Sequence, residues 1–400
     1  MRLSEERKIS LYLYIVLLVN QSGVQLPFLN FMTGNNQIIL AGLLLFIGLF
    51  LFYKRKRLST HSLGMNFFWW LLAALVLSVF MAYLGWGQDF TTSLLLYRHH
   101  IWIFFLPLLF YIKPSVKSIS NALFAFTLTA LFVCFGQIIG LLPPPIHETI
   151  TGVIMDGTNE FGGYGVVGAR LVTFSLYMFL GEMVLKFSRK NIIKVLIALI
   201  AVVLTAQRAL LIFALPLTAF VFLFKVNLSA RKRTAISLLF LVVAMYFFVN
   251  TSEIWLSFLT ETTEQLNDSD YNRWLAFEYF FNMYSNGILP LILGNGFLSL
   301  KNAGGQLIYD LGYSGIFIDD IGMVGVWVRY GIIPFIVLYD IVVNTLRSKT
   351  IPFYLKLMCI HIGFLPISWT LIGPHYFVFV FLIYLYCLNK DLLSKDVKFV

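Results

Sequence analysis

Residues 195–224 read VLIALIAVVLTAQRALLIFALPLTAFVFLF and lie between Lys194 and Lys225. Apolar stretches of this length are typical of membrane-spanning chains, and the main polar interruption is at residues 205–208. One continuous helix would place the two lysines on opposite sides of a bilayer, whereas a hairpin keeps both on one side. Each arm of a hairpin has about 14 residues, or roughly 21 Å, against a hydrocarbon core of about 30 Å. The sequence therefore predicts a helical hairpin whose tip, with Arg208, lies below the outer surface of the membrane.

The composition of the whole chain agrees with a bilayer as its solvent. Of the 400 residues, 59% are hydrophobic and only 12% are charged, and the mean hydropathy is +0.84. Soluble domains typically carry about 25% charged residues, because their surface must be hydrated. Three cysteines all lie inside apolar runs, so they indicate packing and neither a disulfide nor a metal framework.

A window of about 19 residues predicts an all-α polytopic membrane protein with about twelve transmembrane helices. Residues 1–400 are expected to form a single transmembrane domain, and the first helix has no small-residue cleavage site after it. Residues 251–318 are expected to form a large outer loop before the tenth span, with an amphipathic helix at Asn272–Asn286. The predicted spans are 9–27, 36–53, 66–84, 99–112, 119–141, 170–187, 195–206, 208–224, 234–250, 319–345, 353–371 and 374–389.

The basic residues predict the orientation, because Lys and Arg in short loops stay in the cytoplasm during insertion. With the N-terminus inside, the spans place all but six of the 29 Lys and Arg residues on the cytoplasmic side, and the C-terminus is also inside. The net charge of +10 is thus explained by topology and requires no nucleic-acid partner. The other six residues are Arg98, Arg170, Arg208, Arg273, Lys301 and Arg329.

These six outer residues are the candidates for function, and five of them are arginines. The planar guanidinium suits two-point binding of phosphate or carboxylate and keeps its charge at membrane depth. The alternative for Arg98, Arg170 and Lys301 is an ordinary interfacial anchor. The alternative for Arg208 is a structural pair with a carboxylate.

Several segments resemble motifs of one family in order and topology. Residues 204–212 (LTAQRALLI) resemble the arginine-bearing helix start of bacterial O-antigen polymerases and ligases. Asn272-Arg-Trp274 is followed by Leu293-Gly-Asn-Gly-Phe297, and then by Asp319-Asp-Ile-Gly-Met-Val-Gly325 and Gly331, which resembles the polymerase pattern. The likeness covers about residues 160–345.

The resemblance implies a helical, integral-membrane glycosyltransferase of the GT-C-like type in the bacterial cytoplasmic membrane. Such enzymes use undecaprenyl-pyrophosphate-linked glycans, as donor and as acceptor, on the outer face of the membrane. The implied product is O-antigen or capsular polysaccharide, and the implied partners are a chain-length regulator and a flippase. Ligases commonly have a His before the glycine-rich span, where this chain has Asp319-Asp320, so polymerase is favoured over ligase.

The chemistry of such a transfer assigns expected roles to the candidates. A pyrophosphate leaving group gains negative charge, so fixed arginines would stabilise it, and Arg208 and Arg170 are the first choices. Asp320 and Asp319 are candidates for the base that accepts the proton of the attacking hydroxyl, although each is equally well explained as a helix cap. His147 and His375 are weaker alternatives for the base. Further substrate-binding residues are expected to be Arg329, Arg273, Arg98 and Gln207.

No cofactor or metal is expected, because the outer carboxylates between Glu253 and Asp270 are spread along a hydrated loop. A second class of function, a transporter or flippase for an anionic lipid or solute, would also require cations in a membrane cavity. Transporters often have inverted repeats and access from both faces. No repeat is evident, and the unassigned cations lie on one side only, which favours the enzyme.

Overall fold

The computed structural model describes residues 4–21, 34–53, 62–142, 146–148, 154–156, 168–204, 208–226, 272–284, 287–314, 316–364 and 376–396. Within these ranges the chain is overwhelmingly helical, which confirms the helical class predicted from the sequence. The departure is a short antiparallel hairpin of β1 (Ile146–Glu148) and β2 (Ile154–Asp156), in which His147 lies opposite Met155.

The helices of the first half begin with a long antiparallel pair and end with the hairpin around residue 206. They are α1 (Glu5–Asn20), α2 (Gly34–Leu51), α3 (Ser62–Trp86), α4 (Phe90–Tyr97), the 3-10 helix η3 (Arg98–Phe104), α5 (Phe105–Ile112), α6 (Val116–Ile138), α7 (Ala169–Leu185), α8 (Arg189–Leu204), α9 (Arg208–Phe220) and the π-helix η4 (Val221–Lys225).

The helices of the second half are shorter until α16. They are α12 (Asn272–Phe277), the π-helix η5 (Glu278–Tyr284), α13 (Ile288–Leu293), α14 (Ala303–Tyr313), the 3-10 helix η6 (Ile318–Ile321), α15 (Met323–Tyr330), α16 (Ile332–Arg347), α17 (Phe353–Phe364) and α18 (Tyr376–Asp396).

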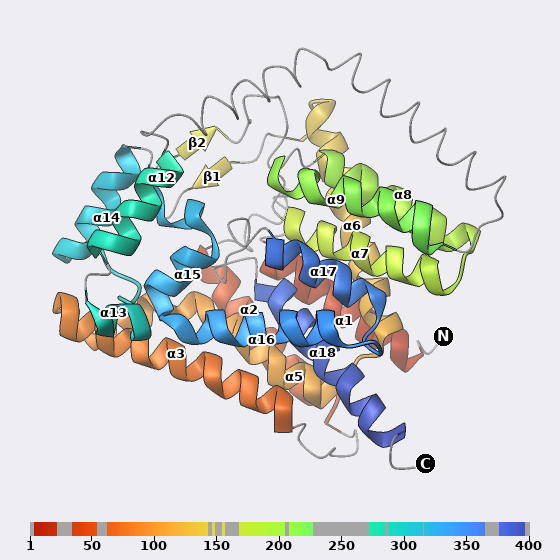
Figure 1. Cartoon of the computed structure of the whole chain (residues 1–400), viewed down its shortest axis with the longest axis horizontal. Coiled ribbons are helices and arrows are strands. Elements are labelled where there is room, and N and C mark those ends of the chain that lie inside the picture. Colours follow the sequence, from red (N-terminus) through yellow and green to blue (C-terminus); the bar gives the residue numbers. More distant parts are fainter. Residues whose placement is uncertain are drawn as a thin grey trace.

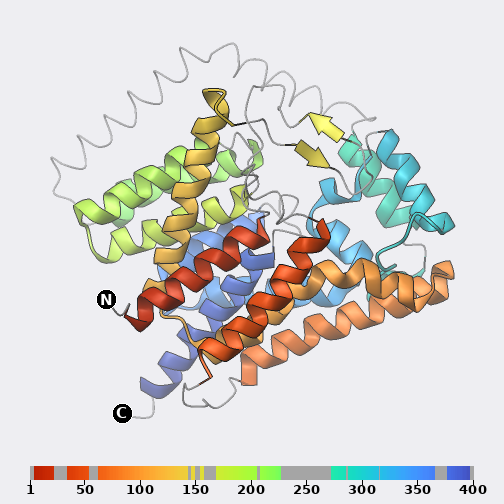
Figure 2. The same cartoon turned by 180° about the vertical axis from the view of Figure 1, so that it is seen from behind.

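The main core joins helices from both halves of the chain. Helix α7 packs against α6, α8 and α17, and α18 packs against α5 and α3. Helix α18 buries every residue from Phe377 to Cys387, which explains why its sequence is apolar on all faces. Figures 1 and 2 show that α1 begins and α18 ends at the same end of the molecule.

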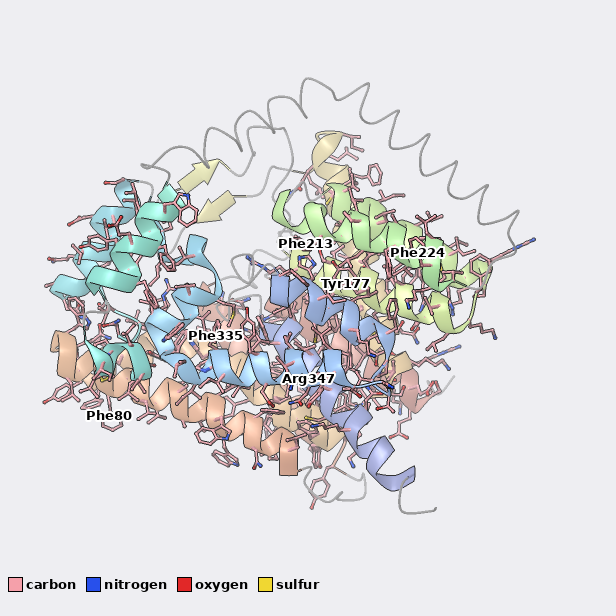
Figure 3. All side chains as sticks on the ribbon, viewed as in Figure 1. Phe80, Tyr177, Phe213, Phe224, Phe335 and Arg347 are labelled. Carbon is pink, nitrogen blue, oxygen red and sulfur yellow. The ribbon has the colours of Figure 1, made fainter. Side chains whose placement is uncertain are left out.

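Large apolar side chains also cover much of the outside. On α2, Ile39 and Phe50 are 68% and 75% exposed, and on α3, Trp69 is 57% exposed. Phe80 and Phe224 lie on the outside at opposite ends of the molecule (Figure 3). Surfaces of this kind are rare on monomeric soluble proteins, so they indicate contact with lipid or with another apolar surface.

The described helices do not fit the predicted count of about twelve spans. Leu63–Trp86 and Val116–Gln137 have the length and hydropathy to cross a bilayer, and α4 with residues 100–112 would be a third span if the 64° bend between them is accepted. Other apolar helices are shorter because the chain breaks them. The predicted tenth span, 319–345, is divided at Gly331, which lies between α15 and α16. Its φ of 77° is not helical, so α15 ends there.

The predicted hairpin over residues 195–224 is confirmed in its helical arms. Helices α8 and α9 are neighbours that run in opposite directions, and the tip at 205–207 lies outside the described residues (Figure 1). At its base, Lys194 is a buried group and not an exposed topogenic charge. Its Nζ lies 2.9 Å from Glu182 Oε2 on α7 and 2.9 Å from Ser120 Oγ on α6. The ion pair ties the hairpin to α7, and the hydrogen bond ties it to α6.

A second, smaller core lies at the other end of the molecule. It joins the end of α3 to α12, α14, η6 and α15, and its buried members include Ala82, Phe280, Leu298 and Val328. Figure 1 shows these elements at the left, away from the ends of α1 and α18. The described part of the segment predicted as an outer loop, residues 272–318, is therefore largely helical and has a core of its own.

Candidate functional site

The turn Gly294-Asn-Gly-Phe297 has two positions, 294 and 296, at which only glycine fits. Gly294 and Gly296 both have a φ of 82°, in the left-handed region that side chains rarely adopt. A Cβ on Gly294 would strike the carbonyl oxygen of Arg329, and one on Gly296 would strike the backbone of Ser78 on α3. The glycines therefore allow the backbones of α15 and α3 to approach the turn closely.

Backbone hydrogen bonds join this turn to the end of α15. The N–H groups of Asn295 and Gly296 donate to the carbonyl oxygens of Val328 and Arg329, at 2.8 and 2.9 Å. The Asn295 side chain donates to the Val328 carbonyl at 3.2 Å. Carbonyl groups at the end of a helix lack partners within it, and the turn supplies them. The structure thus brings together two of the segments that carry the family resemblance.

Arg329 is held at the centre of this junction. It is only 6% exposed, and its guanidinium carbon lies 4.9 Å from the centroid of the Phe297 ring. This is a cation–π distance, and such contacts strengthen as water is removed. Charged side chains in apolar surroundings commonly mark functional positions, so Arg329 is a candidate for binding an anionic group.

A group of buried hydroxyl and imidazole side chains lies beside Arg329. The Tyr97 hydroxyl is hydrogen-bonded to Ser78 Oγ and accepts the N–H of Phe297 at 3.1 Å. His100 Nε2 and the Tyr330 hydroxyl are 2.6 Å apart, and the rings of Tyr97 and His100 are 5.0 Å apart. Sequence reasoning singled out Arg98 in this segment and missed Tyr97 and His100, because Phe297 and Tyr330, which they contact, lie 200 and 230 residues further along the chain.

An apolar pocket adjoins the same group. Its free volume is about 30 Å³, which is room for about one water molecule. Tyr330 forms part of its wall together with Leu71 on α3, Ile103 on η3 and Phe379 on α18. One side chain, Tyr330, therefore borders both the polar group and the apolar pocket.

The first-choice arginines lie on two neighbouring helices. Arg170 is half-buried in the first turn of α7, and Arg208 is the first residue of α9. These helices are in contact, and both begin at the end nearer to α15 (Figure 1). The side chain of Arg208 and all of Gln207 lie outside the described residues. A joint role for Arg170 and Arg208 stays a prediction, supported by the position of the two helix starts.

The remaining candidates are distributed around the second core. Asp319 and Asp320 belong to η6, which packs against α12, the helix that carries Arg273. The backbone of these three residues is described, but their side chains are not. Arg98 is exposed at the junction of α4 and η3, as expected for an anchor at an interface. Its predicted role in substrate binding stays a prediction.

Histidines outside this site have different settings. His147 is in β1, with its side chain outside the description, and His375 is not among the described residues. His361 on α17 is buried, with its Nδ1 hydrogen-bonded to Tyr177 and its ring stacked on Phe213 at a centroid distance of 5.5 Å. These neighbours make His361 a packed core residue.

Comparison of the chain with protein-family models, with curated proteins and with solved structures found no match. In the part of the chain that the structure describes, no group of three or more His, Cys, Asp or Glu residues is placed to hold a metal ion. The arguments about function therefore rest on the residues of this chain.

Proposed function

We propose that the chain is a polysaccharide polymerase that joins undecaprenyl-pyrophosphate-linked oligosaccharide units on the outer face of the bacterial cytoplasmic membrane. One observation carries the proposal: the Gly294–Phe297 turn and the end of α15 fold onto one another around the buried cation of Arg329. Those are segments whose order along the chain resembles the polymerases. The product would be O-antigen or a capsular polysaccharide.

The proposed reaction is a metal-independent glycosyl transfer. The bond between the anomeric carbon of the donor glycan and its pyrophosphate breaks, and a bond from that carbon to a hydroxyl of the acceptor forms. Negative charge on the departing pyrophosphate is met by fixed arginines, which need no reorganisation during the reaction. The hydroxyl proton passes to a carboxylate, for which Asp320 and Asp319 are the candidates.

Two features of the structure support a lipid-linked substrate. The guanidinium of Arg329 carries the positive charge that suits a pyrophosphate. The exposed apolar residues of α2 and α3 suit a bilayer. We propose a multi-pass membrane protein with both termini in the cytoplasm, since α1 begins and α18 ends away from the second core (Figure 1).

The decisive experiment deletes the gene in its host and examines the surface glycan on a gel. Loss of a polymerase leaves single repeat units on the acceptor, whereas loss of a ligase or of a flippase leaves bare acceptor. Complementation with wild type should restore the ladder, and with Arg329→Ala it should not. Arg347→Ala, at an exposed arginine on α16, is the matched control and should restore it. A long-chain ladder in the deletion strain would refute the proposal.

A further inference from the structure

Gln88 lies in the polar turn between α3 and α4, and its side chain is saturated with hydrogen bonds. It is only 3% exposed. Its amide nitrogen donates to Ser93 Oγ at 2.8 Å and to the carbonyl oxygen of Phe297 at 2.9 Å. Its amide oxygen accepts from the N–H of Ser299 at 2.7 Å and from the side chain of Asn302 at 2.9 Å. Only an amide supplies two donors and an acceptor of this geometry.

Phe297 is consequently held at both of its backbone groups by side chains from the first half of the chain. Its carbonyl oxygen accepts from Gln88, and its N–H donates to the hydroxyl of Tyr97. The aromatic ring between these two anchors is the one that carries the guanidinium of Arg329. The position of the ring, and with it the cation, therefore depends on two residues some 200 positions earlier.

The same amide also fixes the start of α14. Asn302, which donates to Gln88, is the N-cap of that helix, and its side-chain oxygen accepts the N–H of Gly305 at 2.7 Å. A Cβ on Gly304 would strike Trp86 at the end of α3 and Leu298. The segment from Phe297 to Gly305 is thus fitted closely around the α3–α4 turn, which leaves little freedom for the turn at Gly294.

We propose that Gln88 and Tyr97 are positioning residues that clamp Phe297 and so set the place of Arg329 for its encounter with an anionic substrate. The inference rests on the proposed function for the identity of that substrate. The clamp explains why an amide and a hydroxyl, both costly to bury, are retained in an apolar end of the molecule. It assigns a role to a turn that has no part in the family resemblance.

The test is a double-mutant cycle on polymer synthesis with purified protein and a lipid-linked repeat unit. Gln88→Glu keeps the shape but replaces two donors with acceptors, which sets a carboxylate oxygen against the Phe297 carbonyl. We expect a loss of about 10²-fold in kcat/KM, as for a displaced substrate-binding group. In an Arg329→Ala background the same substitution should cost little more, because the group that it displaces is absent. Gln306→Glu, at an exposed position of α14, is the matched control.

Two outcomes of this cycle would overturn the inference: a Gln88→Glu enzyme with full activity, or losses from Gln88→Glu and Arg329→Ala that multiply in the double variant. Multiplied losses would indicate a general structural role. Tyr97→Phe provides a second variant, since it removes one hydroxyl and keeps the ring. It should show the same dependence on Arg329, with a smaller loss than Gln88→Glu.

A measurement without any reaction separates this inference from the proposed function. Spin labels at Thr91→Cys and Lys301→Cys, both exposed, report the distance between α4 and the clamped segment. The native cysteines among the described residues are buried and are replaced by alanine if they react. We expect a narrow distance distribution that broadens in Gln88→Glu but not in Gln306→Glu. An unchanged distribution in Gln88→Glu would overturn the clamp, whether or not the wild-type protein makes polymer.

Discussion

The ion pair between Lys194 and Glu182, at the base of the α8–α9 hairpin, is predicted to stabilise the fold around α9, the helix that begins with the candidate residue Arg208. The perturbation is Glu182→Gln, which removes the carboxylate and leaves Lys194 charged. The side chain of Lys194 is 7% exposed, and that of Glu182 is 23% exposed. Removal of one partner from a buried pair typically costs 3–5 kcal/mol. Because water reaches Glu182 in part, we expect the lower end of this range, about 3 kcal/mol.

The assay is thermal unfolding of the purified protein in detergent, followed through its intrinsic tryptophan fluorescence. For a chain of this size the expected loss corresponds to a fall of roughly 3–6 °C in the apparent Tm. The matched control is Glu6→Gln, because Glu6 pairs with Lys117 at 3.1 Å on the surface, with 53% and 74% of the side chains exposed. A surface pair contributes at most about 1 kcal/mol, so the control should change the Tm little.

A further variant separates the pair from the packing around it. Replacing both Glu182 and Lys194 by methionine removes the charge and keeps apolar volume, so it should recover much of the stability that Glu182→Gln loses. The reasoning would be refuted by equal Tm changes for Glu182→Gln and Glu6→Gln. It would also be refuted by a double-methionine variant less stable than Glu182→Gln.

Three further predictions concern backbone space, charge and topology. Gly294→Ala places a side chain at a positive φ and against the carbonyl oxygen of Arg329, so it should lower the free energy of unfolding by about 2 kcal/mol or more. The control is Gly85→Ala, in open space on α3, which should be neutral or slightly stabilising. Both are measured by chemical unfolding. Arg208→Ala and Arg208→Lys should both nearly abolish polymer at matched expression, with losses of roughly 10² to 10³ in rate, and full activity in both would place the pyrophosphate site elsewhere. A reporter fused after Arg233 should read as cytoplasmic and one near Asn267 as external, and an external reading at Arg233 would contradict the hairpin.

The features that could be predicted from the sequence depend on residues close together along the chain. The hairpin followed from the spacing of two lysines and one polar interruption, and both arms are helical in the structure. Sequence reasoning singled out Arg329 for its charge in an apolar segment, and the structure buries it against the ring of Phe297; its role in substrate binding stays a prediction. Hydropathy could not predict where helices end, because Gly331 breaks an apolar run through its backbone angle and not through its polarity.

The features that sequence reasoning missed depend on contacts between distant parts of the chain. Nothing near Gln88 indicates that its amide meets the segment 297–302, because that meeting is set by the packing of α3 against the second core. Lys194 resembles any other basic residue beside a span, and only the approach of Glu182 and Ser120 reveals it as a buried group. Charge patterns predict the side of a membrane more readily than they predict burial.

Helix α15 is shared by the two cores, and this has a consequence for how the protein unfolds. Its residues Met323, Val326 and Tyr330 belong to the main core, whereas Val328 belongs to the second. Gly322 and Gly331, with φ of 55° and 77°, bound the helix. A displacement of either core must therefore also displace this eight-residue helix. The two cores are coupled through α15, so we expect them to unfold in one cooperative step.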